Sequence, residues 1–196
     1  MALKLNSEIK DQALATLQDN WKQPVLAMLL YMVICSVAAI PYASIAVSIF
    51  LILPIEYSLV VSYLDFFRGD KEDMVGKLFN CFRNYGRILG ISLLRTVYIL
   101  LWSLLLIIPG IIKSYSYAMT YFISIDHPEY TAEEAITSSM AMMDGNKMKL
   151  FMLDLSFIGW FLLCLLTLGI GFLWLYPYIY TAHAAFYEDL KANAVL

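Results

Sequence analysis

Four stretches of the chain are long and apolar enough to cross a lipid bilayer as helices. They cover residues 24–43, 45–64, 88–108 and 150–168. A spanning helix needs about 20 mainly apolar residues, because each residue rises by only about 1.5 Å and the hydrocarbon offers no water to bond the backbone. Two shorter, tyrosine-rich stretches, at 111–125 and 172–187, have the same character. We therefore predict an all-α polytopic membrane protein with six transmembrane helices.

The composition favours the same class and argues against others. Apolar residues make up 61% of the chain and charged residues 15%, against roughly 25% charged residues in soluble domains. The first 23 residues contain no apolar run that would form the core of a cleavable signal peptide, so the first span is expected to be an uncleaved anchor. Three scattered cysteines favour neither disulfides nor a metal site, and we expect no metal and no cofactor. The net charge of −3 argues against a nucleic-acid partner, which needs a clustered basic face.

One pattern recurs along the chain. The stretch ILPIEYSLVVSYLDFF at 52–67 returns as LYPYIYTAHAAFYEDL at 175–190, and a shift of 61 residues aligns a third copy. The matching pairs are Pro54 and Pro177, Tyr57 and Tyr180, Gly110 and Gly171, and Tyr115 and Tyr176. We interpret the chain as a single membrane domain, 1–196, built from three hairpin repeats at approximately 1–67, 68–127 and 128–190.

Each repeat begins with a short segment that has a helical apolar stripe and polar residues elsewhere. Asp70 is placed to cap the second segment, and Thr131 and Glu134 form a capping box at the start of the third. These segments are too short to span, so we expect amphipathic interfacial helices at the headgroup boundary. The stripes are Leu5, Ile9, Ala13 and Leu17; Met74, Val75, Leu78, Phe79 and Phe82; and Ala132, Ile136, Met140 and Met143.

The basic residues predict the orientation. Tight turns at 41–44, 108–110 and 168–171 join the two spans of each repeat, and among the basic residues only Lys113 lies close to one of them. Positive charge collects on the cytoplasmic side of membrane proteins, so both termini and the three interfacial helices are expected there. Two spans per repeat give all copies the same orientation, with an axis along the membrane normal. The basic residues expected on the cytoplasmic side are Lys4, Lys10, Lys22, Arg68, Lys71, Lys77, Arg83, Arg87, Lys147, Lys149 and Lys191.

Three stretches of the chain carry a family resemblance: IIPGIIKSYSYAMTYFI at 107–123, DHPEYTAEEAITSSMAMMDGNKMKLF at 126–151, and LYPYIYTAHAAFYEDL at 175–190. They resemble a bacterial integral membrane family catalogued as domain of unknown function 975. The organisation is also distantly similar to the membrane domain of glycerophosphodiester phosphodiesterases, without their soluble catalytic domain. The first resemblance implies a location in a bacterial plasma membrane and brings no assigned activity or catalytic residues.

Ionisable residues inside the spans are the candidates for function, because they are costly there. Glu56, Arg95 and Asp154 fall in one depth band, one in each repeat, and are predicted to form a cluster. Such a cluster is either a structural ion-pair network or the floor of a polar ligand site. The structural interpretation is favoured, because buried ion pairs often only satisfy charges and because Arg95 can also extend its side chain to the interface. His183 is expected to be a packing residue rather than a metal ligand, since no partner falls at ligand spacing on its helix.

Two tyrosine-rich runs are either an aromatic belt at the headgroups, the favoured reading, or the lining of a pocket. Within them, Tyr121 and Tyr180 lie deepest and are the candidates to face a cavity. The sequence Asp126-His127, with Glu129 nearby, is expected to be an exposed cytoplasmic turn.

No catalytic residues are predicted. The chain lacks the motifs H-E-x-x-H, G-x-S-x-G and G-x-x-x-x-G-K-[ST]. The function hypothesis is therefore a non-catalytic membrane protein that binds or transports a lipid-like or small amphiphilic ligand in contact with membrane lipids. The alternative is a structural or regulatory membrane protein that docks a protein partner on its cytoplasmic face. An intramembrane hydrolase ranks third.

Overall fold

The computed structural model describes residues 3–37 and 44–194, and this part of the chain is helical with no strand. Three of the helices are long and apolar enough to cross a membrane: Ile45–Phe67, Tyr85–Leu105 and Lys147–Leu166. The elements are α1 (Asn6–Leu17), α2 (Lys22–Val37), α3 (Ser44–Val47), the π-helix η1 (Ser48–Ile52), α4 (Leu53–Phe67), α5 (Met74–Lys77), the 3₁₀-helix η2 (Leu78–Phe82), α6 (Tyr85–Leu105), α7 (Ile107–Ser116), α8 (Thr120–Asp126), α9 (Ala132–Met142), α10 (Lys147–Leu155), α11 (Ile158–Leu166) and α12 (Phe172–Ala194).

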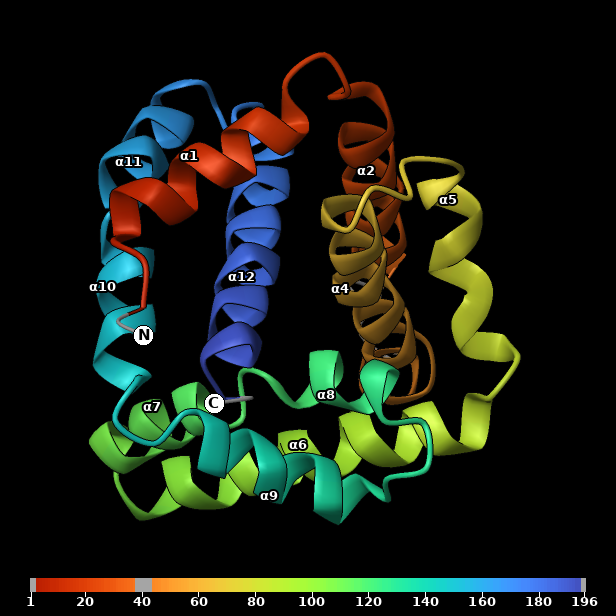
Figure 1. Cartoon of the computed structure of the whole chain (residues 1–196). Helices are drawn as coiled ribbons and strands as arrows, with labels where there is room; N and C mark the ends of the chain where they lie inside the picture. Colours follow the sequence, from red (N-terminus) through yellow and green to blue (C-terminus); the bar gives the residue numbers. More distant parts are fainter. Residues whose placement is uncertain (1–2, 38–43, 195–196) are drawn as a thin grey trace.

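The helices lie close to the predicted spans, with two differences. The stretch 111–125 is divided between α7 and α8, with a break at 117–119, so it forms no single spanning helix. Figure 1 shows that α6 runs across the direction of α4 and α12, so these helices do not form a bundle of parallel rods. The structure therefore supports an all-helical membrane protein with three candidate spans, and the six-span arrangement stays a prediction.

The three segments predicted to be interfacial are helical, and each buries part of its apolar stripe. In α1 these buried residues are Ile9, Ala13 and Leu17, whereas Leu5 lies at the exposed N-cap. The capping box of Thr131 and Glu134 at the start of α9 is confirmed. The prediction that Asp70 caps the second segment was wrong: Asp73 is the N-cap and accepts a hydrogen bond from the Gly76 backbone N–H at 3.0 Å. Asp70 instead binds Lys77.

Each of these segments packs against a helix that lies earlier or later in the chain. The segment η2 packs on α4, and α9 packs on α8 and α6. At the other end of the molecule, α1 packs on α12 (Figure 1). The Lys4 backbone N–H donates to the Asp189 carboxylate at 2.8 Å, which fastens the N-terminal segment to the C-terminal helix.

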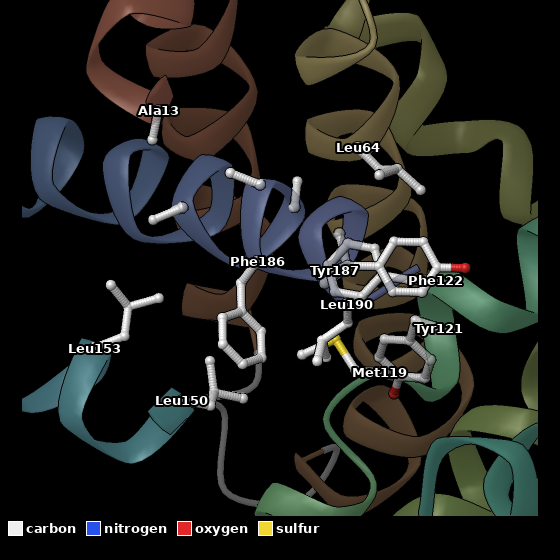
Figure 2. Packing of buried hydrophobic residues seen from close by; sticks show 14 of the residues in the cluster. Ala13, Leu64, Met119, Tyr121, Phe122, Leu150, Leu153, Phe186, Tyr187 and Leu190 are labelled. Carbon is white, nitrogen blue, oxygen red and sulfur yellow. The ribbon is translucent and has the colours of Figure 1, made fainter. Parts of the chain in front are cut away.

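The core lies around α12. Helix α12 contacts α1, α2 and α4 closely because its inner face carries small residues. Beyond them, large side chains complete the core: Figure 2 shows Phe186 beside Leu150 of α10 and Tyr187 stacked on Phe122 of α8. The buried small residues of α12 are Thr181, Ala182, Ala184 and Ala185.

Two glycines permit close packing within the hairpins. A Cβ at Gly110 would lie 2.8 Å from the Ser103 backbone, and one at Gly171 would lie 3.1 Å from the Cys164 backbone. The chain between α6 and α7 turns at Leu106, which is extended at φ −161°. The turn predicted at 108–110 was therefore placed too late, because a proline is tolerated in the first turn of a helix and α7 already includes Pro109. The turn at 168–171 is confirmed, and the turn predicted at 41–44 falls mostly outside the described residues.

A proline leaves one carbonyl of the helix before α4 in need of a donor. Pro54 has no N–H to offer the carbonyl of Phe50, four residues earlier. The chain there forms the π-helix η1, and the hydroxyl of Tyr85 donates to the Phe50 carbonyl at 2.6 Å. Tyr85, the first residue of α6, therefore ties that helix to the preceding hairpin.

Replacing Tyr85 by Phe should lower the stability of the protein by about 1 kcal/mol, because it removes the hydroxyl donor and keeps the ring. The measurement is the free energy of unfolding of the purified protein in detergent. Tyr98→Phe is the matched control, since the Tyr98 hydroxyl makes no hydrogen bond within the described chain. Equal stability of Tyr85→Phe and the wild type would contradict a stabilising role for the hydrogen bond from Tyr85 to the Phe50 carbonyl.

Candidate functional site

Two of the three predicted charged residues come together. Arg95 of α6 faces Glu56 of α4 with 3.9 Å between Nη1 and Oε1. Its Nε donates to the carbonyl of Tyr117 at 3.2 Å, at the break between α7 and α8. The guanidinium also lies over the ring of Tyr121, 4.6 Å from the centroid. Arg95 is thus held by an acid, a carbonyl and an aromatic face, which together offset the loss of water around the charge.

Tyr121 lies in the interior beneath this pair. Only 3% of its surface is exposed, and its hydroxyl has no hydrogen-bond partner among the described residues. The same holds for the buried hydroxyl of Ser92, one turn before Arg95 on α6. Buried polar groups are usually paired, so the surroundings of Arg95 hold unused hydrogen-bonding capacity.

A cavity of about 350 Å³ lies between α2 and α12. Tyr180 lies on its wall and stacks on Tyr63 with 5.3 Å between ring centroids. Glu56 lies seven residues before Tyr63, on the same face of α4, and this face therefore meets Tyr180 of the cavity wall. The cavity is lined by Met28, Tyr31, Met32, Cys35, Tyr176 and Tyr180. Of the two tyrosines proposed to face a cavity, Tyr180 does so and Tyr121 lies buried behind the ion pair.

Asp154 does not join Glu56 and Arg95. Its carboxylate contacts His183 Nε2 of α12 at 2.6 Å and accepts a hydrogen bond from the Tyr115 hydroxyl of α7 at 3.0 Å. The reason lies in the packing, because α10 lies against α7 and α1. The predicted three-residue cluster is therefore divided into a Glu56–Arg95 pair and an Asp154–His183 pair. Sequence spacing missed the role of His183 because its partner comes from another helix.

A second charged cluster lies where α4, α8 and α12 end. Arg68, just after α4, donates to both carboxylate oxygens of Asp126 at 2.7 and 2.8 Å, and its Nε donates to Glu188 at 2.6 Å. The Tyr187 hydroxyl and the Lys191 ammonium donate to the same Asp126 carboxylate at 2.8 and 2.7 Å. The side chain of Asp126 is only 10% exposed. The prediction of an exposed turn was therefore wrong for Asp126, although His127 and Glu129 are exposed.

The Asp126 carboxyl is strongly stabilised as an anion. Burial alone would raise its pKa, but hydrogen bonds from Arg68, Lys191 and Tyr187 outweigh that effect and hold the pKa well below its ordinary range. The three donors come from the ends of two other helices. The cluster therefore joins α8 to α4 and α12 and is saturated by its own partners.

Within residues 3–37 and 44–194, no group of three or more His, Cys, Asp or Glu side chains gathers in a way that would hold a metal ion. The two carboxylates that accept several contacts, Asp126 and Asp154, already have protein donors.

Comparison with known proteins gives one match. Residues 103–194 match the family described as "Protein of unknown function (DUF975)". The matched region covers the end of α6 and the elements α7 to α12. This agrees with the resemblance seen in the sequence over the same region. Neither the curated proteins nor the solved structures gave a match, and the likeness to the phosphodiesterase membrane domain stays a prediction.

Replacing Asp126 by Asn should lower the free energy of unfolding at neutral pH by about 1 to 3 kcal/mol, because Arg68 and Lys191 lose their shared anion while remaining partly hydrated. Because the pKa of Asp126 is lower in the folded than in the unfolded chain, its contribution is complete above about pH 4 and is lost as the pH falls further. The difference between wild type and Asp126→Asn should therefore shrink in acid.

Glu188→Gln is the control for this measurement, because Glu188 is more exposed and, within the described part of the chain, its carboxylate pairs with Arg68 alone. Unfolding free energies are measured in detergent from neutral pH down to acid. A difference between wild type and Asp126→Asn that stays constant with pH would contradict the linkage.

Proposed function

We propose that this protein is a non-catalytic integral membrane protein that binds a lipid-like or small amphiphilic ligand in the cavity between α2 and α12. The single observation that carries the proposal is a cavity lined by tyrosines among apolar helices, with Glu56 of the Glu56–Arg95 pair on the face of α4 that meets its wall. Ligand sites combine apolar lining with a few convergent polar groups. An amphiphile satisfies both parts.

The cavity has two chemically different walls. Met28 and Met32 of α2 provide flexible apolar surface. Tyr31 and Tyr180 line the same space, and Glu56 lies on the face of α4 that meets Tyr180 through Tyr63. A chain would lie against the methionines, and a polar head would meet the tyrosines and the carboxylate.

The membrane arrangement that we propose has six spans in three hairpin repeats, with both termini and the interfacial helices on the cytoplasmic side of a bacterial plasma membrane. Its support is the order of packing: η2 lies on α4, α9 on α8, and α1 on α12. In each case the leading segment of one repeat covers the second helix of another, as a closed threefold arrangement requires. The distribution of Lys and Arg supports the orientation.

The alternative function, docking of a protein partner on the cytoplasmic face, has one observation in its favour. Glu133, Glu134 and Thr137 lie exposed at the start of α9 around a shallow surface hollow. A photo-crosslinker at Glu133 tests it, because a docking protein would yield one stoichiometric adduct there. Absence of such an adduct, together with ligand binding in the α2–α12 cavity, favours the first proposal.

Ligand binding can be measured at Cys35, which lines the cavity. In a Cys81→Ala, Cys164→Ala background, we expect at least one of three probes, oleate, oleylamine or oleoyl-lysophosphatidylethanolamine, to slow alkylation of Cys35 by N-ethylmaleimide. For the two probes that carry an ammonium group, oleylamine and oleoyl-lysophosphatidylethanolamine, Glu56→Gln should reduce the protection about fivefold or more, since the ammonium loses its carboxylate partner. Glu72→Gln, an exposed acid outside the cavity, should leave it unchanged.

Equal protection in Glu56→Gln and wild type, or no protection by any probe, would reject the site. The thermal midpoint of each variant in detergent shows that the protein remains folded. Arg95→Ala is a less clean change, because Arg95 also bonds the Tyr117 carbonyl.

The orientation predicts a labelling pattern in intact bacterial cells. Single cysteines at Ile107 and Ile170, both exposed at hairpin ends, should react with a membrane-impermeant maleimide in a cysteine-free background. A cysteine at Glu133 should react only after the membrane is permeabilised. Labelling of Ile107→Cys and Ile170→Cys from opposite sides would overturn the repeat arrangement.

A further inference from the structure

A second cavity, of about 270 Å³, lies where η2 and the first turn of α6 meet α4 and the end of α8. It uses the face of α4 that carries Tyr57, Ser62 and Asp65. With about 100° between successive residues of a helix, this face points away from Glu56 and Tyr63. The cavity is therefore separate from the one between α2 and α12.

The cavity has more positive than negative charge available. Lys77 is already paired with Asp70 at 2.6 Å. Arg83 lies on the rim and has no acidic partner among the described residues. Asp65 is the one acid in the lining, and no donor side chain contacts its carboxylate in the described chain. Two guanidinium groups, those of Arg83 and Arg87, thus face one carboxylate.

Arg87 is held in place without being neutralised. One of its Nη atoms donates to the carbonyls of Ser124, His127 and Tyr130 at 2.9, 3.2 and 3.3 Å. Its Nε is buried and has no partner among the described residues. Carbonyl groups orient a guanidinium but leave its charge, so Arg87 retains the capacity to bind an anion.

The start of α6 lacks the negative charge that a helix N-terminus favours. No acidic residue lies in its first turn, and the side chain of the N-cap residue Asn84 makes no capping hydrogen bond. Instead Arg83 and Arg87 stand at the positive end of the helix dipole, where like charge is unfavourable. The N-terminus of α6 and the two guanidinium groups both make this end of the cavity positive, as is typical of phosphate sites at helix N-termini.

An exposed aromatic row lies beside the cavity. Phe79, Phe82 and Tyr85 stack in sequence, with 6.4 and 5.9 Å between successive ring centroids. Phe79 is 46% and Phe82 is 49% exposed. These residues alternate along the chain with the cavity residues Asn80, Arg83 and Asn84. A polar, cationic cavity thus adjoins an apolar strip, as a molecule with a phosphate head and an acyl chain requires.

We propose that this cavity binds the headgroup of an anionic phospholipid. Arg83 and Arg87 bind the phosphodiester. The Asp65 carboxylate accepts hydrogen bonds from headgroup hydroxyls, and the Asn80 side-chain amide donates to them. An acyl chain lies along Phe79 and Phe82. One phosphodiester charge, added to two guanidinium groups and one carboxylate, makes the site neutral. The site does not depend on the ligand cavity between α2 and α12.

The test is a titration of the purified full-length chain in a non-ionic detergent with dioctanoyl phosphatidylglycerol, followed by native mass spectrometry. We expect saturation at one lipid per chain. Arg83→Gln should weaken binding about tenfold, as expected for the loss of one charge-assisted hydrogen bond. Asn80→Trp, which fills the cavity without removing charge, should weaken it by at least as much. Arg87 is left intact because it also donates to one carbonyl in the last turn of α8 and to two that follow this helix.

Lys22→Gln is the matched charge control, because Lys22 is an exposed cation at the start of another long helix. It should bind the lipid like the wild type. Equal loss in Lys22→Gln and Arg83→Gln would reveal diffuse electrostatic attraction and overturn the site. Retained binding in both Arg83→Gln and Asn80→Trp would overturn it as well.

Two further probes separate the parts of the ligand. Dioctanoylglycerol, which lacks phosphate, should not bind at this cavity. Glycerol 3-phosphate and inorganic phosphate should bind far more weakly than the lipid, because they cannot use the aromatic row. Equal binding of inorganic phosphate would assign the cavity to a soluble phosphate compound instead of a lipid.

Discussion

The Asp126 carboxylate is the contact on which the arrangement of three helices depends. It accepts hydrogen bonds from Arg68 after α4 and from Tyr187 and Lys191 of α12. Helix α8 has only seven residues, and helices this short are unstable alone. Its position must therefore come from tertiary contacts, which include the Asp126 cluster and the stacking of Phe122 on Tyr187. Because α8 carries Tyr121 and adjoins the Tyr117 carbonyl, the same contacts place the groups that hold Arg95.

Closure of the molecule depends on the first and last helices. Helix α1 packs on α12, and the Lys4 N–H binds Asp189. The buried small residues of α12, among them Ala182 and Ala185, let neighbouring helices approach closely. A chain of hairpins without such a contact would leave the apolar face of α1 unpaired, with Ile9, Ala13 and Leu17 exposed. The N-terminal segment is therefore part of the core, although its sequence alone looks like a surface helix.

The sequence predicted the class of fold and most helix positions, but it predicted only some contacts of the site. Periodicity placed Ile9, Ala13 and Leu17 on one buried face, and local capping chemistry located the start of α9 at Thr131. Both signals depend on residues within one turn or one helix. The partner of a side chain on another helix follows from packing angles, which the sequence does not encode locally. Depth along a span brought Glu56 and Arg95 together correctly, whereas Asp154 at the same depth faces His183.

Helix α4 separates the two proposed ligand sites and also connects them. Glu56 lies on the face of α4 that meets Tyr180 of the first site, and its neighbour Tyr57 lines the second. Tyr57 meets the ring of Tyr121 edge to face at a centroid distance of 5.2 Å, and Arg95 lies on that same ring. The Tyr57 hydroxyl also contacts Ser124 at 3.1 Å, so both contacts reach α8. Any influence of one site on the other requires an element whose position differs between states and whose contacts reach both sites. In this structure the contacts of α8 reach both sites. Tyr121, which lies under Arg95, and Ser124, which lies beside the second cavity, would move together if this short helix shifted.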